Sequence, residues 1–478
     1  MSTPAKLLIA TLLILGLSAR FINLNAPPAG HHQWRQSDTA AVAKNMSQSD
    51  GNLLHPKVDW RKDTTGHVEM EFPIYCWTTA KSYTLLGPHH WIPRSLSITA
   101  SLIALFIFYR LVKLLSDPST ALWSAAFFAA LPLNIFFSRS IQPESWMLCS
   151  MLGATYSAAL WSRSKKSHYL IAAALFAALS GLLKLPALVV GLPMLAVILQ
   201  SRGTNPLKSP TLWAAAIASL IPVIAWYTHA HTLYQETGLT FGISQSDKWN
   251  RFELLLEPTF YKDLFVGKII EDHLAIIGFP LAALGLIMRN RKPTEILFDA
   301  WLLAMLIQIV LVPQGHRVHD YYQLPIAVPA AFYIGRFLSR GITRSKHAPT
   351  IQTLLAAIFF ILSSRTLWNT FSKELNPPQA DQRLIGLIAD NTNAGELVVL
   401  ARDDTAFDPY VLYMANRKGW LITTDDLSEN YINSLAGSGA GWLIVESTAG
   451  EQGEGFHVGR AATVTFEYDG VRIFLLSN

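Results

Sequence analysis

The chain has 478 residues, of which 51% are hydrophobic and only 15% are charged. Soluble globular proteins carry about 25% charged residues, so this composition excludes an ordinary soluble enzyme, a disordered regulator and a small disulfide-stapled module. Two cysteines are too few for a disulfide framework or a four-cysteine zinc site. The net charge of +5 is uneven, because residues 369–478 hold 7 Lys and Arg against 15 Asp and Glu. A basic body with an acidic tail does not describe a nucleic-acid binder, and we predict a polytopic membrane protein.

Eleven apolar runs are long enough to cross a bilayer as helices. They lie near residues 6–23, 94–115, 119–138, 144–162, 168–184, 186–201, 210–229, 273–289, 297–313, 324–340 and 350–367. The stretch 168–201 could instead form one broken span, and residues 7–19 also resemble the apolar part of a signal peptide.

Basic clusters support one orientation of these runs. If the N-terminus is cytoplasmic, the clusters fall in cytoplasmic loops, as the positive-inside rule requires, at 110–113, 163–166, 202–208, 289–292 and 336–346. We therefore expect residues 1–368 to form a multi-pass domain of the inner membrane. Its periplasmic loops would be 24–93, 139–143, 230–272 and 314–323.

Residues 369–478 differ in composition, because Gly and Asp become frequent and long apolar runs disappear. Strands are expected at 396–400, 420–423, 441–446, 462–468 and 471–476, and a helix at 409–415. Asp469 and Gly470 form a hairpin-turn signal between the last two strands. The segment is expected to be a small periplasmic α/β domain.

The first outer loop begins with a dense group of polar side chains. Residues 31–40 read His-His-Gln-Trp-Arg-Gln-Ser-Asp-Thr-Ala. Arg35 and Asp38 are three residues apart and would share one helix face, where they could pair. Asp38 is then either a helix cap or ion-pair partner, or a general base. His31 and His32 with Asp38 suggest metal ligands, but no further ligand at a typical spacing is apparent, so no metal site is predicted.

Other ionisable groups are expected at the same face of the membrane. Glu71-Phe72-Pro73 ends the first loop, and the later loops and span ends contribute Arg94, Arg139, Glu144, His316, Arg317, His319, Tyr321 and Tyr322. Charges at that depth are costly unless they pair or face a wet cavity, which makes these side chains functional candidates. The structural alternatives are a headgroup-facing Arg94, helix-end charges and aromatic anchors. Lys184, among leucines, is expected to extend to the membrane surface or, alternatively, to contact phosphate in a cavity.

The order of these motifs resembles a known superfamily. His32–Ala40, Glu71–Pro73, Arg139–Glu144 and His319–Tyr322 make the first 340 residues similar to the bacterial polytopic GT-C glycosyltransferases, which are related to protein O-mannosyltransferases and lipid A aminoarabinose transferases. The resemblance implies that Asp38 is the catalytic carboxylate and that Glu144 is the second-loop acid, where many relatives have Asp. Aminoarabinose transferases have Lys-Pro-Pro at Glu71-Phe72-Pro73, which argues against that particular substrate.

The resemblance implies an inverting transfer of a monosaccharide from a polyprenyl-phosphate carrier to a hydroxyl of a glycolipid, glycan or protein. Lipopolysaccharide is one such acceptor, and no nucleotide-binding motif is present. Asp38 would take the proton of the acceptor hydroxyl. Candidates for binding the leaving phosphate or the sugar are Arg35, Arg94, Arg139, His316, Arg317, His319, Tyr321 and Tyr322. Two alternatives stay open: a lipid or glycan flippase, and a non-catalytic envelope assembly protein.

Overall fold

The computed structural model describes residues 3–244, 249, 251–289, 291–342, 345–403, 408–446, 462–468 and 470–476. The chain divides into two compact units. Unit 1 consists of residues 1–24, 94–229 and 242–370, and unit 2 of residues 25–93, 230–241 and 371–478. The first outer loop is thus grouped with the tail rather than with the rest of residues 1–368.

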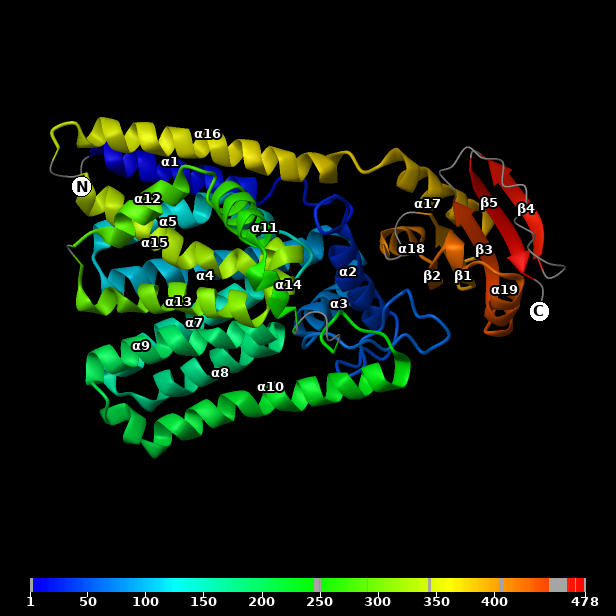
Figure 1. The fold of residues 1–478 in the computed structure, drawn as a ribbon, viewed down its shortest axis with the longest axis horizontal. Coiled ribbons are helices and arrows are strands. Elements are labelled where there is room, and N and C mark those ends of the chain that lie inside the picture. Colours follow the sequence, from blue (N-terminus) through cyan, green and yellow to red (C-terminus); the bar gives the residue numbers. More distant parts are fainter. Residues whose placement is uncertain are drawn as a thin grey trace. The chain divides into compact units, whose positions relative to one another are not determined.

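Unit 1 is helical, and three of its helices continue into unit 2 (Figure 1). The helices are α1 (Thr3–Ala19), α4 (Trp91–Leu115), α5 (Pro118–Ala130), α6 (Pro132–Phe137), α7 (Glu144–Ser164), α8 (Ser167–Leu183), η1 (Leu185–Val190), α9 (Gly191–Arg202), η2 (Asn205–Lys208), α10 (Pro210–Thr237), η4 (Phe252–Leu256), α11 (Pro258–Tyr261), η5 (Lys262–His273), α12 (Gly278–Ile287), η6 (Pro293–Glu295), α13 (Ile296–Leu311), α14 (Pro313–Val318), η7 (Asp320–Ile326), α15 (Ala327–Arg336), η8 (Phe337–Gly341) and α16 (Ala348–Leu375).

The chain is a multi-pass helical membrane protein. Within the described ranges, five helical segments are long and apolar enough to cross a bilayer: Trp91–Leu115, Leu185–Arg202, Pro210–Thr237, Pro293–Leu311 and Ala348–Asn391. A sixth is counted if Pro258–His273 and Gly278–Ile287, bent by 101°, form one span. Several expected spans are shorter or interrupted helices, such as Thr3–Ala19 and Ser167–Leu183. The count of eleven stays a prediction.

Close helix packing in unit 1 depends on glycine. Helix α15 contacts α5, and a Cβ added at Gly335 would lie 2.2 Å from Ser124 Oγ and 2.5 Å from its backbone nitrogen. Gly335→Ala should therefore lower the thermal midpoint, since overpacking a well-packed core costs about 1–3 kcal/mol. Gly386→Ala is the matched control, because nothing lies within 4 Å of that added Cβ. Equal midpoints for Gly335→Ala and the wild type would show that α15 and α5 are not packed this closely.

Unit 2 combines loop helices with a mixed sheet. Its elements are α2 (Gln33–Ser47), α3 (Ile74–Leu86), α17 (Gln379–Asn391), β1 (Leu397–Arg402), α18 (Tyr410–Ala415), β2 (Lys418–Thr423), η9 (Thr424–Asp426), α19 (Glu429–Gly437), β3 (Ala440–Glu446), β4 (Ala462–Tyr468) and β5 (Val471–Leu476). The strand order is β2-β1-β3-β5-β4, in which β1 is parallel to β2 and β3, while β5 is antiparallel to β3 and β4.

The expected strands and helix of the tail are confirmed to within a few residues, and α17 and α19 are additional. Asp469 lies outside the described residues, whereas Gly470 has a φ of +80° that suits the expected hairpin turn. One face of the sheet packs on α19 through Val399, Trp420, Leu435 and Leu443.

The first loop is attached to this sheet by backbone hydrogen bonds. Lys62 N donates to Gly419 O at 3.0 Å, and Gly419 N donates to Asp59 O at 2.9 Å. Gly419 is required at this point, because an added Cβ would lie 1.8 Å from Val398 O. Strand β2 therefore holds the loop segment that contains Asp59 and its neighbour Trp60.

Candidate active site

Asp38 lies in the second turn of α2, and its side chain is fully buried. Trp60 Nε1 donates a hydrogen bond to Asp38 Oδ1 at 2.8 Å. Within the described part of the chain, Oδ2 has no hydrogen-bond partner. One carboxylate oxygen is thus fixed by the indole, while the other is buried without a hydrogen-bond partner.

Burial raises the pKa of Asp38 from 3.8 to about 8. The Trp60 hydrogen bond and the charge of Arg35 lower this pKa, while the charges of Asp59 and Asp408 raise it. Burial is the largest of these influences because a charged carboxylate loses hydration in an apolar environment. A pKa this close to neutral makes Asp38 a stronger base than an ordinary aspartate, as proton transfer in catalysis requires.

The raised pKa of Asp38 also predicts a pH-dependent stability. Between pH 4 and 8 the unfolded chain releases a proton that the folded chain retains, so rising pH favours unfolding by up to about 1.4 kcal/mol per pH unit. Asp38→Asn removes this titration and keeps an oxygen for Trp60. The variant should therefore have a higher thermal midpoint than the wild type, with a difference that grows from pH 5 to pH 8. A constant difference over that range would contradict the raised pKa.

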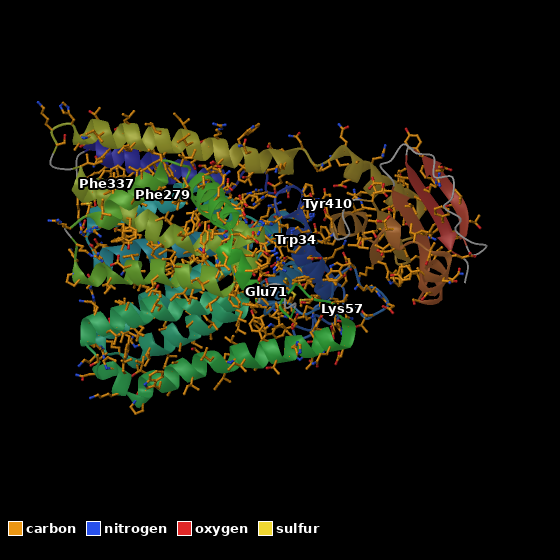
Figure 2. All side chains as sticks on the ribbon, viewed as in Figure 1. Trp34, Lys57, Glu71, Phe279, Phe337 and Tyr410 are labelled. Atoms are coloured by element: carbon orange, nitrogen blue, oxygen red, sulfur yellow. The ribbon has the colours of Figure 1, made fainter. Side chains whose placement is uncertain are left out.

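Arg35 pairs with a different carboxylate from the one expected. Its Nη2 forms a buried ion pair with Glu71 Oε1, and its guanidinium carbon lies 4.5 Å from the centroid of the Phe241 ring. No ion pair between Asp38 and Arg35 occurs among the described residues, so the alternative in which Asp38 is the ion-pair partner of Arg35 is wrong. Figure 2 labels Glu71 among the side chains of this region.

The segment that holds Phe241 is joined to the first loop. Glu69 N donates to Leu239 O at 3.0 Å, and Phe241 N donates to Glu69 O at 2.9 Å. Thr240 Oγ1 also donates to the Glu69 carboxylate. Because Glu69 is two residues before Glu71, one stretch of backbone positions both the ring and the carboxylate that hold Arg35.

Glu144 belongs to a second group of candidates, which lies in unit 1. Its carboxylate is fully buried and forms an ion pair with Lys184 Nζ. The ammonium group lies 3.9 Å from the centroid of the Tyr321 ring and 5.2 Å from that of Tyr322. The ring of His319 stacks on Tyr321 at 4.8 Å between centroids. We call Glu144, Lys184, His319, Tyr321 and Tyr322 the Glu144 group.

The Glu144 group corrects the expectation for Lys184. Only 12% of its side chain is exposed, and the ammonium group points at a buried carboxylate instead of extending to the membrane surface. A cation held by a carboxylate and an aromatic face is well placed to receive a phosphate group.

Arg94 and Arg139 are fully buried in unit 1. Arg94 Nη1 donates to the backbone oxygen of Arg139 at 3.1 Å, and Arg139 Nη2 donates to Asn23 O at 3.0 Å. The structural alternative for Arg94, an arginine that faces lipid headgroups, is therefore wrong. Both side chains hold the turn between α6 and α7, which directly precedes Glu144, the first residue of α7.

His316 and Arg317 have different environments. Burial lowers the pKa of His316 to about 3, so the imidazole is neutral at pH 7 and offers hydrogen bonds but no charge. Its Nδ1 lies 3.0 Å from Gln323 Nε2. Arg317 is partly exposed and pairs with Glu257 at 2.6 Å. His316 is thus not a cation for a leaving phosphate, whereas Arg317 remains one candidate.

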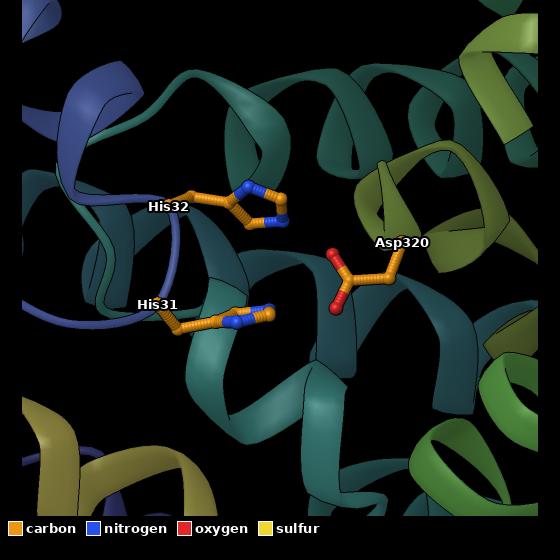
Figure 3. Close-up of side chains that lie close together, drawn as sticks. All are labelled: His31, His32 and Asp320. Atoms are coloured by element: carbon orange, nitrogen blue, oxygen red, sulfur yellow. The ribbon is translucent and has the colours of Figure 1, made fainter. Parts of the chain in front are cut away.

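His31 and His32 lie side by side in unit 2, with ring centroids 4.3 Å apart (Figure 3). His32 has φ and ψ of 52° and 38° and precedes the first residue of α2.

Three contacts of the site were not expected from the sequence. Trp60 and Phe241 lie 22 and 203 positions from Asp38 in the chain. Sequence spacing does not predict contacts between residues this far apart. The sequence could have indicated that Lys184 is paired, because a lone cation among leucines is energetically costly unless it has a partner. Its partner Glu144 is 40 residues away.

Known proteins share parts of this sequence and the whole fold. The sequence profile of the family described as dolichyl-phosphate-mannose-protein mannosyltransferase matches residues 71–229. The crystal structure of ArnT from Cupriavidus metallidurans bound to undecaprenyl phosphate superposes with a TM-score of 0.68, at 12% identity, over 98% of this chain and 97% of that one. The chain has the fold of the GT-C glycosyltransferases. The expected superfamily resemblance is confirmed.

Two further relatives match over a smaller share of the chains. The Archaeoglobus fulgidus oligosaccharyltransferase in complex with Zn and sulfate shares this GT-C fold with a TM-score of 0.58 and 12% identity, over 92% of this chain and 67% of that one. "Putative mannosyltransferase YycA" of Bacillus subtilis (strain 168) is 28% identical over 152 residues. That match spans 30% of this chain and 20% of the relative.

Proposed function

We propose that the protein is an inverting glycosyltransferase that moves a monosaccharide from a polyprenyl-phosphate carrier to a hydroxyl acceptor at the periplasmic face. The observation that carries this proposal is Asp38, a buried carboxylate with one oxygen fixed by Trp60 and the other without a hydrogen-bond partner among the described residues. The GT-C fold, and the undecaprenyl phosphate bound in the ArnT structure, support a lipid-phosphate donor. The acceptor is a glycolipid, a glycan or a protein.

The reaction is a single displacement. Asp38 Oδ2 takes the proton of the acceptor hydroxyl while that oxygen attacks the anomeric carbon of the donor sugar. The bond from this carbon to the phosphate oxygen breaks on the opposite face, and polyprenyl phosphate leaves with the electron pair. Attack opposite the leaving group inverts the anomeric configuration. Asp38 afterwards releases its proton to water.

The leaving phosphate carries concentrated negative charge and needs cations placed in advance. Lys184 is the candidate that the Glu144 group presents, with Arg94, Arg139 and Arg317 as further candidates in unit 1 and Arg35 in unit 2. Tyr321 and Tyr322 offer ring faces and hydroxyl groups to a sugar. Their proximity to the Lys184 ammonium supports a shared role in donor binding.

The proposed function is tested with the full-length protein in nanodiscs. Undecaprenyl phosphate carrying radiolabelled mannose is the first donor, followed by other monosaccharides, and envelope membranes from a strain lacking the gene supply acceptors. We expect label to move to an acceptor and free undecaprenyl phosphate to appear in equal amount. Movement of intact donor between leaflets without transfer would support a flippase. Neither transfer nor movement would support a non-catalytic assembly protein.

A further inference from the structure

Arg35 is the cation that could most easily neutralise Asp38. The two residues are three apart on α2, and side chains at this spacing are neighbours on a helix surface. An ion pair with Arg35 would occupy Asp38 Oδ2, the oxygen that the proposed reaction needs. The structure shows the opposite arrangement, in which the guanidinium pairs with Glu71.

We propose that Glu71 is a positioning residue that holds the Arg35 guanidinium away from Asp38 and thereby keeps one carboxylate oxygen free. This inference rests on the proposed role of Asp38 as the base. It assigns Glu71 no contact with substrate.

The ion pair between Arg35 and Glu71 is strong because both side chains are buried. The side chains of Arg35 and Glu71 are only 5% and 9% exposed. A buried ion that loses its partner is strongly destabilised, so it moves to another partner if one is within reach. With Glu71 neutralised, the carboxylate of Asp38 is the anion on the same helix face.

A second group, the Phe241 ring, also fixes the position of the Arg35 guanidinium. The Phe241 ring covers the guanidinium at 4.5 Å. Backbone hydrogen bonds between Glu69 and residues 239 and 241 connect this ring to the segment that leads to Glu71. The Phe241 ring and the Glu71 carboxylate therefore fix the position of the Arg35 guanidinium together.

Other groups around Asp38 do not take over this role. Asp59 and Asp408 raise the pKa of Asp38, and Trp60 donates to Oδ1 only. Cys76 from α3 directs its Sγ to the backbone oxygen of Thr39 at 3.6 Å. Arg35 is the cation whose charge lowers the pKa of Asp38, so a closer approach of the guanidinium would lower this pKa further.

The test measures the protonation of Asp38 without any sugar substrate. Dicyclohexylcarbodiimide adds to protonated carboxyl groups in apolar surroundings, and mass spectrometry reads the product in tryptic peptides. Asp38 is the sole carboxyl side chain of tryptic peptide 36–44, or of peptide 21–44 where Arg35 is replaced, and Asp59 is the sole carboxyl side chain of peptide 58–61. We compare wild type, Glu71→Gln, Glu71→Asp and the double variant Glu71→Gln/Arg35→Gln, all as full-length protein between pH 5 and 9.

In the wild type, Asp38 should be labelled at pH 7, with labelling that declines around pH 8. Glu71→Gln should reduce this labelling at pH 7 by about twofold to about ninetyfold, because an adjacent arginine lowers a carboxyl pKa by about 1–3. The double variant should restore labelling, and Glu71→Asp should retain much of it. Labelling of Asp59 is the control for local folding and should be the same in all four proteins.

Equal Asp38 labelling in Glu71→Gln and wild type, or no recovery in the double variant, would overturn the inference. Sugar transfer by wild type and Asp38→Asn is measured in parallel. If Asp38→Asn transfers sugar as fast as wild type, the proposed function of Asp38 fails, whatever the labelling shows. If Asp38→Asn is inactive and labelling is unchanged by Glu71→Gln, the inference about Glu71 alone fails.

Discussion

Asp38→Asn should lower the rate of sugar transfer by about 10²–10⁴-fold, the usual contribution of a positioned general base. Asparagine has nearly the same shape and keeps an oxygen for the Trp60 indole, so α2 and the first loop should stay in place. The amide cannot accept the acceptor proton at Oδ2. The loss should therefore appear in kcat, measured with saturating donor in nanodiscs.

Glu467→Gln is the matched control for this variant. Glu467 is an exposed acid in β4, paired with Arg472 at 2.8 Å, and its conversion to an amide removes one charge from the same unit. It should transfer sugar at the rate of the wild type. Full activity of Asp38→Asn would remove the carboxylate from the mechanism.

Lys184→Met should be the most destabilising single change in the Glu144 group. It leaves the Glu144 carboxylate fully buried without its cation, and removing one partner of a buried pair costs about 3–5 kcal/mol. The thermal midpoint of the purified protein should fall by several degrees. Transfer should fall as well, since the leaving phosphate loses a cation.

The double variant Lys184→Met/Glu144→Gln separates stability from catalysis. Removing both charges should restore much of the thermal midpoint, because no uncompensated charge is left. Transfer activity should stay low if Lys184 contacts the donor phosphate. Recovery of activity together with stability would show that the ion pair is structural only.

The sequence was informative where one physical rule decided the outcome. The change in composition and an Asp-Gly turn signal predicted the strands of the tail, and scarcity of charge predicted a membrane protein. Local spacing was less reliable for side-chain partners. Arg35 and Asp38 satisfy the rule for a helical pair, yet Glu71 competes from another part of the loop and takes the guanidinium.

Contacts between distant segments were out of reach of the sequence. Trp60 reaches Asp38 because strand β2 holds the first loop through Gly419. The residues around position 60 do not predict this contact. Lys184 and Glu144 were each noted as costly charges, but their pairing depends on how α7 packs against the residues that follow α8. Apolar length did not separate long helices from short or interrupted ones, because both have the same composition.

The pH dependence of kcat/KM for sugar transfer tests the central claim most directly, because it reports ionisation of the free enzyme. With a pKa of about 8 for Asp38, kcat/KM should rise about tenfold per pH unit up to that point and then level off. The residual activity of Asp38→Asn should lack this rise. A wild-type profile that is flat from pH 5 to pH 9, or the same rise in Asp38→Asn, would contradict Asp38 as the base.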